Sequence, residues 1–407
     1  MTFKRKALAL SLAFTSLGLA SQAAAQEQPK AQQQIKVSPQ ASPAITKLDA
    51  AVKANDFTNL PALVAEATAK AKTADDRYAI ASLQLRAAQA QKDNAGVAAA
   101  VEAMLATGKV PATEAGRLRM GVAQLRFDAK QYDQAAAGFE QVIAADPNNL
   151  DALVLLAETR NLQNRPADAL PLLQKAIQLR TAQGQQVPES WHQRATALAF
   201  NNKLPGAAQV AREWAKAYPS ANSWRAAILT FEPTSGLTGP DLLDLYRLQR
   251  AAGAFKGEAD YYRYVDQLNL RGFPGEAKAV LDEAFAAKAL DRNKPMWRDL
   301  YASVSGKVAA DKASLAASEK TALAAPAARQ AIVTGDAFLG YGDYAKAANL
   351  YRAALGKSGV DKDLANLRLG VALARAGDKA GATTAFQAVQ GQRAGIAQLW
   401  LAWLNRA

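Results

Sequence analysis

The sequence predicts an all-α protein built as an α-solenoid, a right-handed superhelix of antiparallel helix pairs. From Ala44 onward, apolar residues recur at spacings of three and four in blocks of about a dozen residues, which is the period of an amphipathic helix. No sustained alternation of apolar and polar residues indicates a strand. The blocks also repeat about every 34 residues, and a fixed period of this length is typical of stacked helical repeats.

The first 25 residues have the composition of a secretory signal peptide. Lys4, Arg5 and Lys6 precede an uncharged apolar stretch, and Ala23 to Ala25 fit an A-x-A cleavage site. We expect export to the bacterial periplasm, with secretion into the medium as the second choice, because an exported chain without Cys is more typical of a bacterial envelope. No later run is apolar and long enough to span a bilayer, so we expect no transmembrane segment in the mature chain.

The composition excludes most site chemistry. The 407 residues include one His and no Cys, so thiolate nucleophiles, Cys zinc sites, disulfides and an H-E-x-x-H motif are impossible. Glu189-Ser190 resembles the Glu-Ser pair of lytic transglycosylases, but it lies at the start of a predicted repeat helix, and no non-repetitive stretch is long enough for their catalytic domain. We predict a protein that is not an enzyme and that holds no cofactor and no metal.

The remaining chain is assigned in order from the N-terminus. Residues 26–43 are rich in Gln, Pro and Ser, and they predict a disordered leader. A first solenoid region is predicted over 44–230, beginning with two weakly patterned helix pairs. The Gly/Pro-rich residues 231–240 are a candidate hinge. A second solenoid region is predicted over 241–407, and its last helix, which contains Trp400 and Trp403, is expected to cap the final unit rather than to contact a membrane or partner.

Six helix pairs share a clear register and begin near residues 116, 150, 188, 258, 328 and 363. The pattern is strongest near the C-terminus, where equivalent positions 35 residues apart hold Gly335 and Gly370, Ala347 and Ala382, and Tyr351 and Phe386. Small residues are expected where two helices approach closely, and aromatic residues where one pair packs on the next. At these positions the chain resembles the tetratricopeptide repeat (TPR) family.

The resemblance implies that the first helix of each pair lines a concave, partner-binding groove. Transferred through the register, the lining positions are Arg117, Gln124, Phe127, Asp128, Glu158, Asn161, His192, Gln193, Phe200, Tyr262, Arg263, Asp266, Asn269, Arg368 and Arg375. Amide, guanidinium and ring groups suit peptide recognition, and a merely solvated helix face is the alternative for each residue. Some TPR domains clamp a carboxylate with Lys, Asn and Arg side chains. This clamp is not expected here, since the matching positions hold Met120, Gln124, Leu155, Glu189 and Gln193.

The function expected from this organisation is a protein–protein interaction scaffold or adaptor in the bacterial cell envelope, with a protein or peptide partner in the concave groove. The alternative is a peptidoglycan- or polysaccharide-associated accessory protein, or a degenerate murein enzyme. The formal net charge of +13, or +10 without the three basic residues of the signal peptide, indicates anionic envelope polymers rather than nucleic acid for an exported chain. The alternative, which we favour because no block of five or more like charges marks a dedicated patch, is that the charge only keeps the chain soluble.

Overall fold

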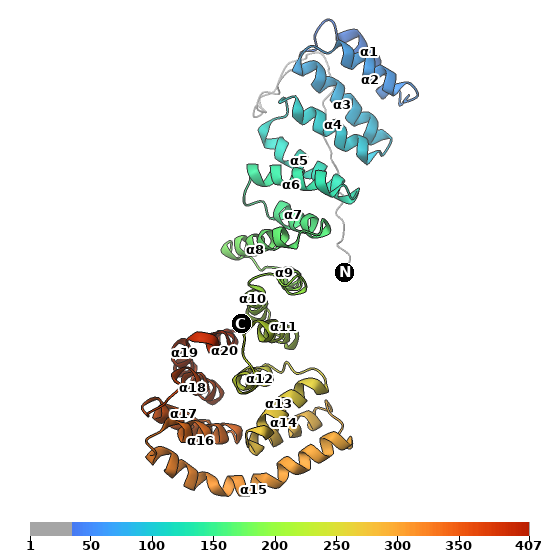
Figure 1. The fold of residues 1–407 in the computed structure, drawn as a ribbon. Helices are drawn as coiled ribbons and strands as arrows, with labels where there is room; N and C mark the ends of the chain where they lie inside the picture. The colour runs from blue at the N-terminus through green and yellow to red at the C-terminus, as the bar shows by residue number, and fades with distance from the viewer. Residues whose placement is uncertain (1–34, 407) are drawn as a thin grey trace, which may run out of the picture. The chain divides into compact units, whose positions relative to one another are not determined.

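The computed structural model describes residues 35–406, and its regular secondary structure in that range is helical (Figure 1). The described chain contains α-helices, three short 3-10 helices and one isolated bridge between Ala327 and Ser358, but no strand. The predicted all-α solenoid is therefore confirmed. The predicted signal peptide and residues 26–34 of the predicted leader lie outside the described residues.

The chain divides between Gln186 and Val187 into two compact units. We call the described parts unit 1 (residues 35–186) and unit 2 (residues 187–406). Residues 231–240, the candidate hinge, lie inside unit 2 rather than at this division. They form η1 (Glu232–Thr234) and the start of η2 (Gly239–Leu242), and Leu237 is buried in the core of unit 2.

Unit 1 consists of helix pairs that follow one another along the chain. The pairs are α1 (Ser42–Lys53) with α2 (Leu60–Lys70), α3 (Ala74–Ala90) with α4 (Asn94–Ala106), α5 (Ala112–Asp128) with α6 (Tyr132–Ala145), and α7 (Leu150–Leu162) with α8 (Pro166–Ala182). Helices of one pair pack on each other, and the second helix of a pair packs on the first helix of the next. The pair expected near residue 150 begins there, whereas the pair expected near residue 116 begins four residues earlier, at Ala112.

The end of the predicted leader is held in place against unit 1. The backbone N–H and the hydroxyl of Ser38 both donate hydrogen bonds to the carboxylate of Asp76, at 2.7 and 2.8 Å. Ala41 is fully buried beside α1. Residues 35–41 are therefore ordered because Asp76, at the start of α3, offers an acceptor for their polar groups.

Unit 2 contains both regular pairs and helices outside the register. Its helices are α9 (Glu189–Asn201), α10 (Ala207–Ala217), α11 (Ala221–Phe231), α12 (Leu243–Ala251), α13 (Glu258–Leu270), α14 (Pro274–Ala286), α15 (Pro295–Ala324), α16 (Ala328–Gly340), α17 (Tyr344–Leu355), α18 (Lys362–Ala376), α19 (Lys379–Gln387) and α20 (Ala394–Leu404), with η3 (Gly391–Arg393) before α20. The longest of these helices, α15, packs on α14, α16 and α17.

Small residues lie at the close helix contacts, as the register predicts. A Cβ atom on Gly335 would lie 2.7 Å from the ring of Tyr351, and a Cβ on Gly370 would overlap the ring of Phe386. In unit 1 a Cβ on Gly138 would lie 2.8 Å from the Cβ of Ala123. Each distance is shorter than van der Waals contact, so a side chain at these glycines would separate the two helices.

The last helix of unit 2 packs on helices from the beginning of the same unit. Figure 1 shows α20 next to α18 and α19 and close to α10 and α12, and these helices are in contact. Its residues Ile396, Leu399 and Trp400 are fully buried. Helix α20 therefore joins the end of unit 2 to its start.

Candidate functional site

The predicted groove residues of unit 1 lie on the first helices of its third and fourth pairs. On α5, Arg117, Gln124 and Asp128 are exposed, and their spacings of seven and four place them on one face. The buried residues Leu118 and Val122 occupy another face of the same helix. The exposed face of α5 is therefore polar and charged.

The equivalent face of α7 carries amide and apolar groups. Asn161 is exposed, Glu158 is half-buried, and Leu162 is 45% exposed although it is a large apolar residue. Phe127, the α5 residue at the position of Asn161, is half-buried, with its ring 5.9 Å from that of Tyr132 in an edge-to-face arrangement. The two helices together present polar groups beside accessible apolar surface, which is the composition of many protein interfaces.

In unit 2 the predicted groove residues have different environments. The exposed ones are Gln193, Phe200 (50%), Tyr262 (44%) and Arg375. Three others, Arg263, Asp266 and Asn269, are half-buried. Arg263 pairs with Asp260 and Glu232, and Asn269 accepts a hydrogen bond from Lys307. His192 and Arg368 are buried.

The buried His192 and the nearby Glu189 have structural contacts. The ring of His192 lies 5.9 Å from that of Tyr218, and burial lowers the pKa of the imidazole despite the carboxylates of Glu213 and Glu189. The Glu189 carboxylate accepts a hydrogen bond from the indole N–H of Trp214 at 3.1 Å. Both side chains therefore help to pack α9 against α10.

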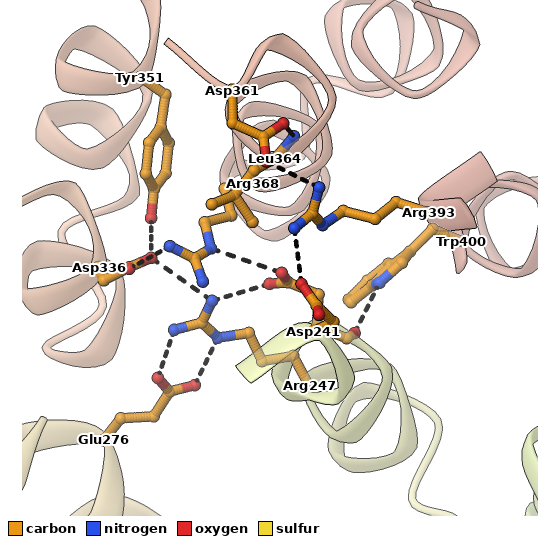
Figure 2. Close-up of polar contacts among 11 residues, drawn as sticks. Asp241, Arg247, Glu276, Asp336, Tyr351, Asp361, Leu364, Arg368, Arg393 and Trp400 are labelled. Carbon is orange, nitrogen blue, oxygen red and sulfur yellow. Dashed lines mark hydrogen bonds and ion pairs between the residues drawn. The ribbon is translucent and has the colours of Figure 1, made fainter. Parts of the chain in front are cut away.

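A buried network of ion pairs lies at the centre of unit 2, and Arg247 of α12 is its main donor. Figure 2 shows the Arg247 guanidinium donating two parallel hydrogen bonds to Glu276 of α14, at 2.8 and 3.1 Å. The same group donates to Asp244, one turn earlier on α12, at 2.8 Å. Tyr264 of α13 donates its hydroxyl hydrogen to Glu276 at 2.5 Å. Helices α12, α13 and α14 are thus joined through Arg247 and Glu276.

A second guanidinium, that of Arg368, extends the network to the C-terminal helices. Arg368 of α18 donates to Asp336 of α16 at 2.5 Å, and to Asp244 at 3.4 Å (Figure 2). The hydroxyl of Tyr351 donates to Asp336 at 2.7 Å. The indole N–H of Trp400 donates to the backbone carbonyl of Asp244 at 3.0 Å. Helix α12 is therefore bonded to both α18 and α20.

The charges within this network do not cancel. Three carboxylates, those of Asp244, Glu276 and Asp336, share the two guanidinium groups of Arg247 and Arg368. Burial acts to raise the pKa of Glu276, but the charge and hydrogen bonds of Arg247 hold that pKa below its ordinary value. Burial raises the pKa of Asp336, which competes with the other two carboxylates for positive charge.

Most of this network was missed by sequence analysis. Residues 241–257 fall between register units, so Asp244 and Arg247 had no assigned position. Their spacing of three residues on a leucine-rich helix was the available signal, because it places an acid and a base together on an apolar element. Arg368 was predicted to line a groove, but its side chain is buried against Asp336 and Asp244.

Beside the network is a small crevice of about 20 Å³, room for roughly one water-sized group. Its lining comes from seven helices of unit 2 and consists of Arg247, Arg250, Tyr264, Glu276, Leu339, Tyr344, Val371, Arg375 and Trp400. Arg250 forms two hydrogen bonds with Glu283, at 2.6 and 2.9 Å. Arg375 donates to the hydroxyl of Tyr344 at 3.2 Å, and its guanidinium carbon lies 5.6 Å from the centroid of that ring.

Within residues 35–406, no three His, Cys, Asp or Glu side chains are grouped so that they could hold a metal ion. None of the helices in that range has the length and apolar character needed to cross a bilayer.

Comparison with known proteins identifies repeats in both units. Residues 126–187 match a family model described as tetratricopeptide repeat, and residues 332–398 match a second model with the same description. Tetratricopeptide repeats are generally non-catalytic scaffolds for protein partners. The comparison with curated proteins gives no match.

Several solved structures are similar at low sequence identity. One, from work on Pseudomonas aeruginosa pilF, is 14% identical, covers 58% of this chain and 92% of its own, and has a TM-score of 0.28. A complex of Naa15/Naa10 bound to HypK-THB is 11% identical over 85% of this chain and 63% of its own, with a TM-score of 0.36. A tetratricopeptide repeat protein from Parabacteroides merdae is 12% identical over 83% of this chain and 100% of its own, with a TM-score of 0.25. The two family matches, which agree with the observed helix pairs, identify residues 126–187 and 332–398 as tetratricopeptide repeats.

Proposed function

We propose that this protein is a non-catalytic scaffold or adaptor of the bacterial cell envelope, exported to the periplasm by its N-terminal segment. The proposal rests chiefly on the repeated helix pairs of unit 1, whose first helices present exposed polar groups beside accessible apolar surface. Gln124 and Asn161 are exposed amides on neighbouring pairs, and Leu162 adds apolar area. Amides bind peptide backbones, and apolar area supplies binding energy, so this surface suits a protein or peptide partner.

Site-specific photo-crosslinking in cells tests the proposed partner surface. A photo-reactive residue replaces Gln124 or Asn161 on the first helices, and the matched control replaces Gln141, an exposed residue of the second helix α6. We expect crosslinks to a discrete protein from the two first-helix positions and none from the control. Equal crosslinking at all three positions, or none at Gln124 and Asn161, would contradict the proposal.

Export is tested separately from partner binding. Fractionation of cells that produce the full chain is expected to recover a shortened protein in the periplasmic fraction, with an N-terminus at Gln26. Replacing Lys4, Arg5 and Lys6 by Glu is expected to leave the uncleaved chain in the cytoplasm, since the basic n-region directs export. Full-length protein in the cytoplasm of wild-type cells would contradict the periplasmic assignment.

The second candidate is association with an anionic envelope polymer such as peptidoglycan, and the distribution of charge favours it. Residues 187–407 contain 28 basic and 20 acidic residues, whereas residues 35–186 contain 17 and 15. The excess positive charge is therefore concentrated in the C-terminal half, where it would attract anionic polymers. Retention on purified sacculi at moderate salt would support this candidate, and release at moderate salt would favour the scaffold.

A further inference from the structure

The crevice at the centre of unit 2 has an arginine whose charge is not paired. Arg247 and Arg250 both line it, and each forms two hydrogen bonds with one glutamate, Glu276 or Glu283 respectively. Arg375 lines the same crevice and is exposed. Among residues 35–406 no carboxylate lies within ion-pair distance of Arg375, whose contacts are the hydroxyl and ring of Tyr344.

The guanidinium of Arg375 is held in position without being neutralised. Tyr344 accepts one hydrogen bond from Nη2 at 3.2 Å and faces the guanidinium with its ring. A guanidinium has five N–H donors in a planar fork, so the remaining donors are available to a second group. The edge of that planar fork is complementary to a planar acceptor such as a carboxylate.

The surroundings of Arg375 are suited to a protein partner. Residues 351–407 contain eight basic and only three acidic residues, so this end of unit 2 attracts negative charge. Trp400 lines the crevice. The ring centroid of Trp403 lies 5.4 Å from that of Trp400 in an edge-to-face arrangement, and the guanidinium of Arg406 lies over the Trp403 ring. Tyr, Trp and Arg are the residue types that contribute most to binding energy at protein interfaces.

We propose that the mouth of this crevice binds an acidic side chain of a protein partner, with Arg375 as the principal donor and Tyr344 as its positioning residue. The inference rests on the proposed scaffold function and names the chemistry of the partner. The carboxylate forms hydrogen bonds with the free N–H groups of Arg375 at the crevice mouth, and Arg250 adds positive charge behind it. The crevice itself has room for about one water and is too small for a carboxylate, so the acidic group binds at its mouth.

Binding of a labelled hexaglutamate peptide by the full chain tests this inference, with a hexaglutamine peptide as the uncharged probe. Fluorescence anisotropy at low salt is expected to show binding of hexaglutamate alone. Arg375→Ala is expected to weaken it by at least about tenfold, the effect of losing hydrogen bonds between charged groups. Arg375→Lys is expected to lie between wild type and Arg375→Ala, because lysine keeps the charge but loses the planar fork.

The matched control is Arg352→Ala, which removes the same charge from an exposed position on α17 outside the crevice. We expect this variant to change the Kd for hexaglutamate by less than about threefold, the size of a screened long-range charge effect. Equal losses from both variants, or wild-type protein that binds neither peptide, would overturn the inference. Crosslinking from Gln124 in unit 1 distinguishes the two proposals: if it persists while hexaglutamate fails to bind, the scaffold function stands and the acidic-partner site is wrong.

Discussion

In unit 1 the extensive contacts of each helix are with helices close to it in the chain, whereas in unit 2 the last helix, α20, also packs on α10 and α12. The buried apolar residues follow the same division. In unit 1 they form separate clusters, such as one from α1 to α3 and one from α3 to α5. In unit 2 one large cluster extends from Ala211 to Ala402.

This difference determines how each unit is stabilised. Where contacts join only successive pairs, stability is approximately a sum of pair and neighbour terms, and one pair can open without the others. In unit 2 the network around Arg247 and Arg368 joins α12, α14, α16 and α18, so loss of one member affects helices distant in the chain. We therefore expect unit 1 to respond locally to substitution and unit 2 to respond as a whole.

The largest effects are expected from Trp400→Ala in unit 2 and Phe139→Ala in unit 1. Both side chains are fully buried, and each truncation is expected to lower the free energy of unfolding by about 3–5 kcal/mol. Hydrogen exchange distinguishes the two variants by the helices in which amide protection is reduced. Trp400→Ala should reduce protection in α10, α12, α18 and α20, and Phe139→Ala only in α5 to α8. If Trp400→Ala affected α19 and α20 alone, unit 2 would not be cooperative.

Removal of the central guanidinium tests the network itself. Arg247→Ala leaves Asp244 and Glu276 buried without their main partner, and such a change is expected to destabilise the protein by about 3–5 kcal/mol. The control is Arg126→Ala in unit 1, whose partner Glu102 is 47% exposed, with an expected loss of about 0.2–1 kcal/mol. Urea unfolding measures both values, and similar losses would show that the buried network contributes no more than a surface pair.

Acid is expected to weaken the N-terminal end of unit 1 through Asp76. Burial acts to raise the pKa of this carboxyl, but hydrogen bonds from Ser38, Lys72 and Thr73 hold its pKa well below the ordinary 3.8. The ionised form of Asp76 stabilises the folded state. Its contribution to the free energy of unfolding is therefore complete above the ordinary pKa and is lost as the pH falls through the lowered pKa.

At pH 6, Asp76→Asn is expected to reduce the free energy of unfolding of the α1–α3 region by about 1.5–3 kcal/mol, the value of hydrogen bonds to a charged group. Hydrogen exchange at several pH values should show this difference shrink as the solution is acidified towards pH 2. Asp128→Asn, on the exposed face of α5, is the control. A difference between wild type and Asp76→Asn that stayed constant with pH would contradict the assignment.

The smallest effects are expected from glycine substitutions, and they differ in sign. Gly370→Ala places a methyl group against the ring of Phe386 and is expected to cost about 1–3 kcal/mol through overpacking. Gly116→Ala, within α5, meets no atom within 4 Å and is expected to stabilise by about 0.5–1 kcal/mol through helix propensity. Thermal unfolding measures both shifts. Stabilisation by Gly370→Ala would show that the helices of the last pair do not need this close contact.

Much of the fold could be predicted from sequence because a helix pair is a local structure. The register starts near 150, 188, 258, 328 and 363 agree within about one residue with the first residues of α7, α9, α13, α16 and α18, whereas the start near 116 lies four residues after the first residue of α5. Small residues such as Gly335 and Gly370 were assigned to close helix contacts, and they lie there. These features depend on residues within one or two helical turns of each other or in the next repeat, so a periodic pattern records them.

The site was predicted less well, because a register position specifies a helix face but not what lies opposite that face. Arg368 and Arg375 occupy positions seven residues apart on one face of α18. Arg375 is exposed, but Arg368 is buried because Asp244 of α12 and Asp336 of α16 lie against it. No repeat pattern relates α12 to α18.

The sequence by itself determined the helix pairs, their register and the small residues at their contacts, because each of these depends on spacing along a short stretch of chain. The tertiary structure decided which solenoid face is open and which is filled. The bond from Trp400 to the backbone of Asp244 joins residues 156 positions apart, and such a contact exists only after the intervening helices have packed. The contact is therefore determined by how all the intervening helices of unit 2 pack, and not by a pattern in the neighbouring sequence.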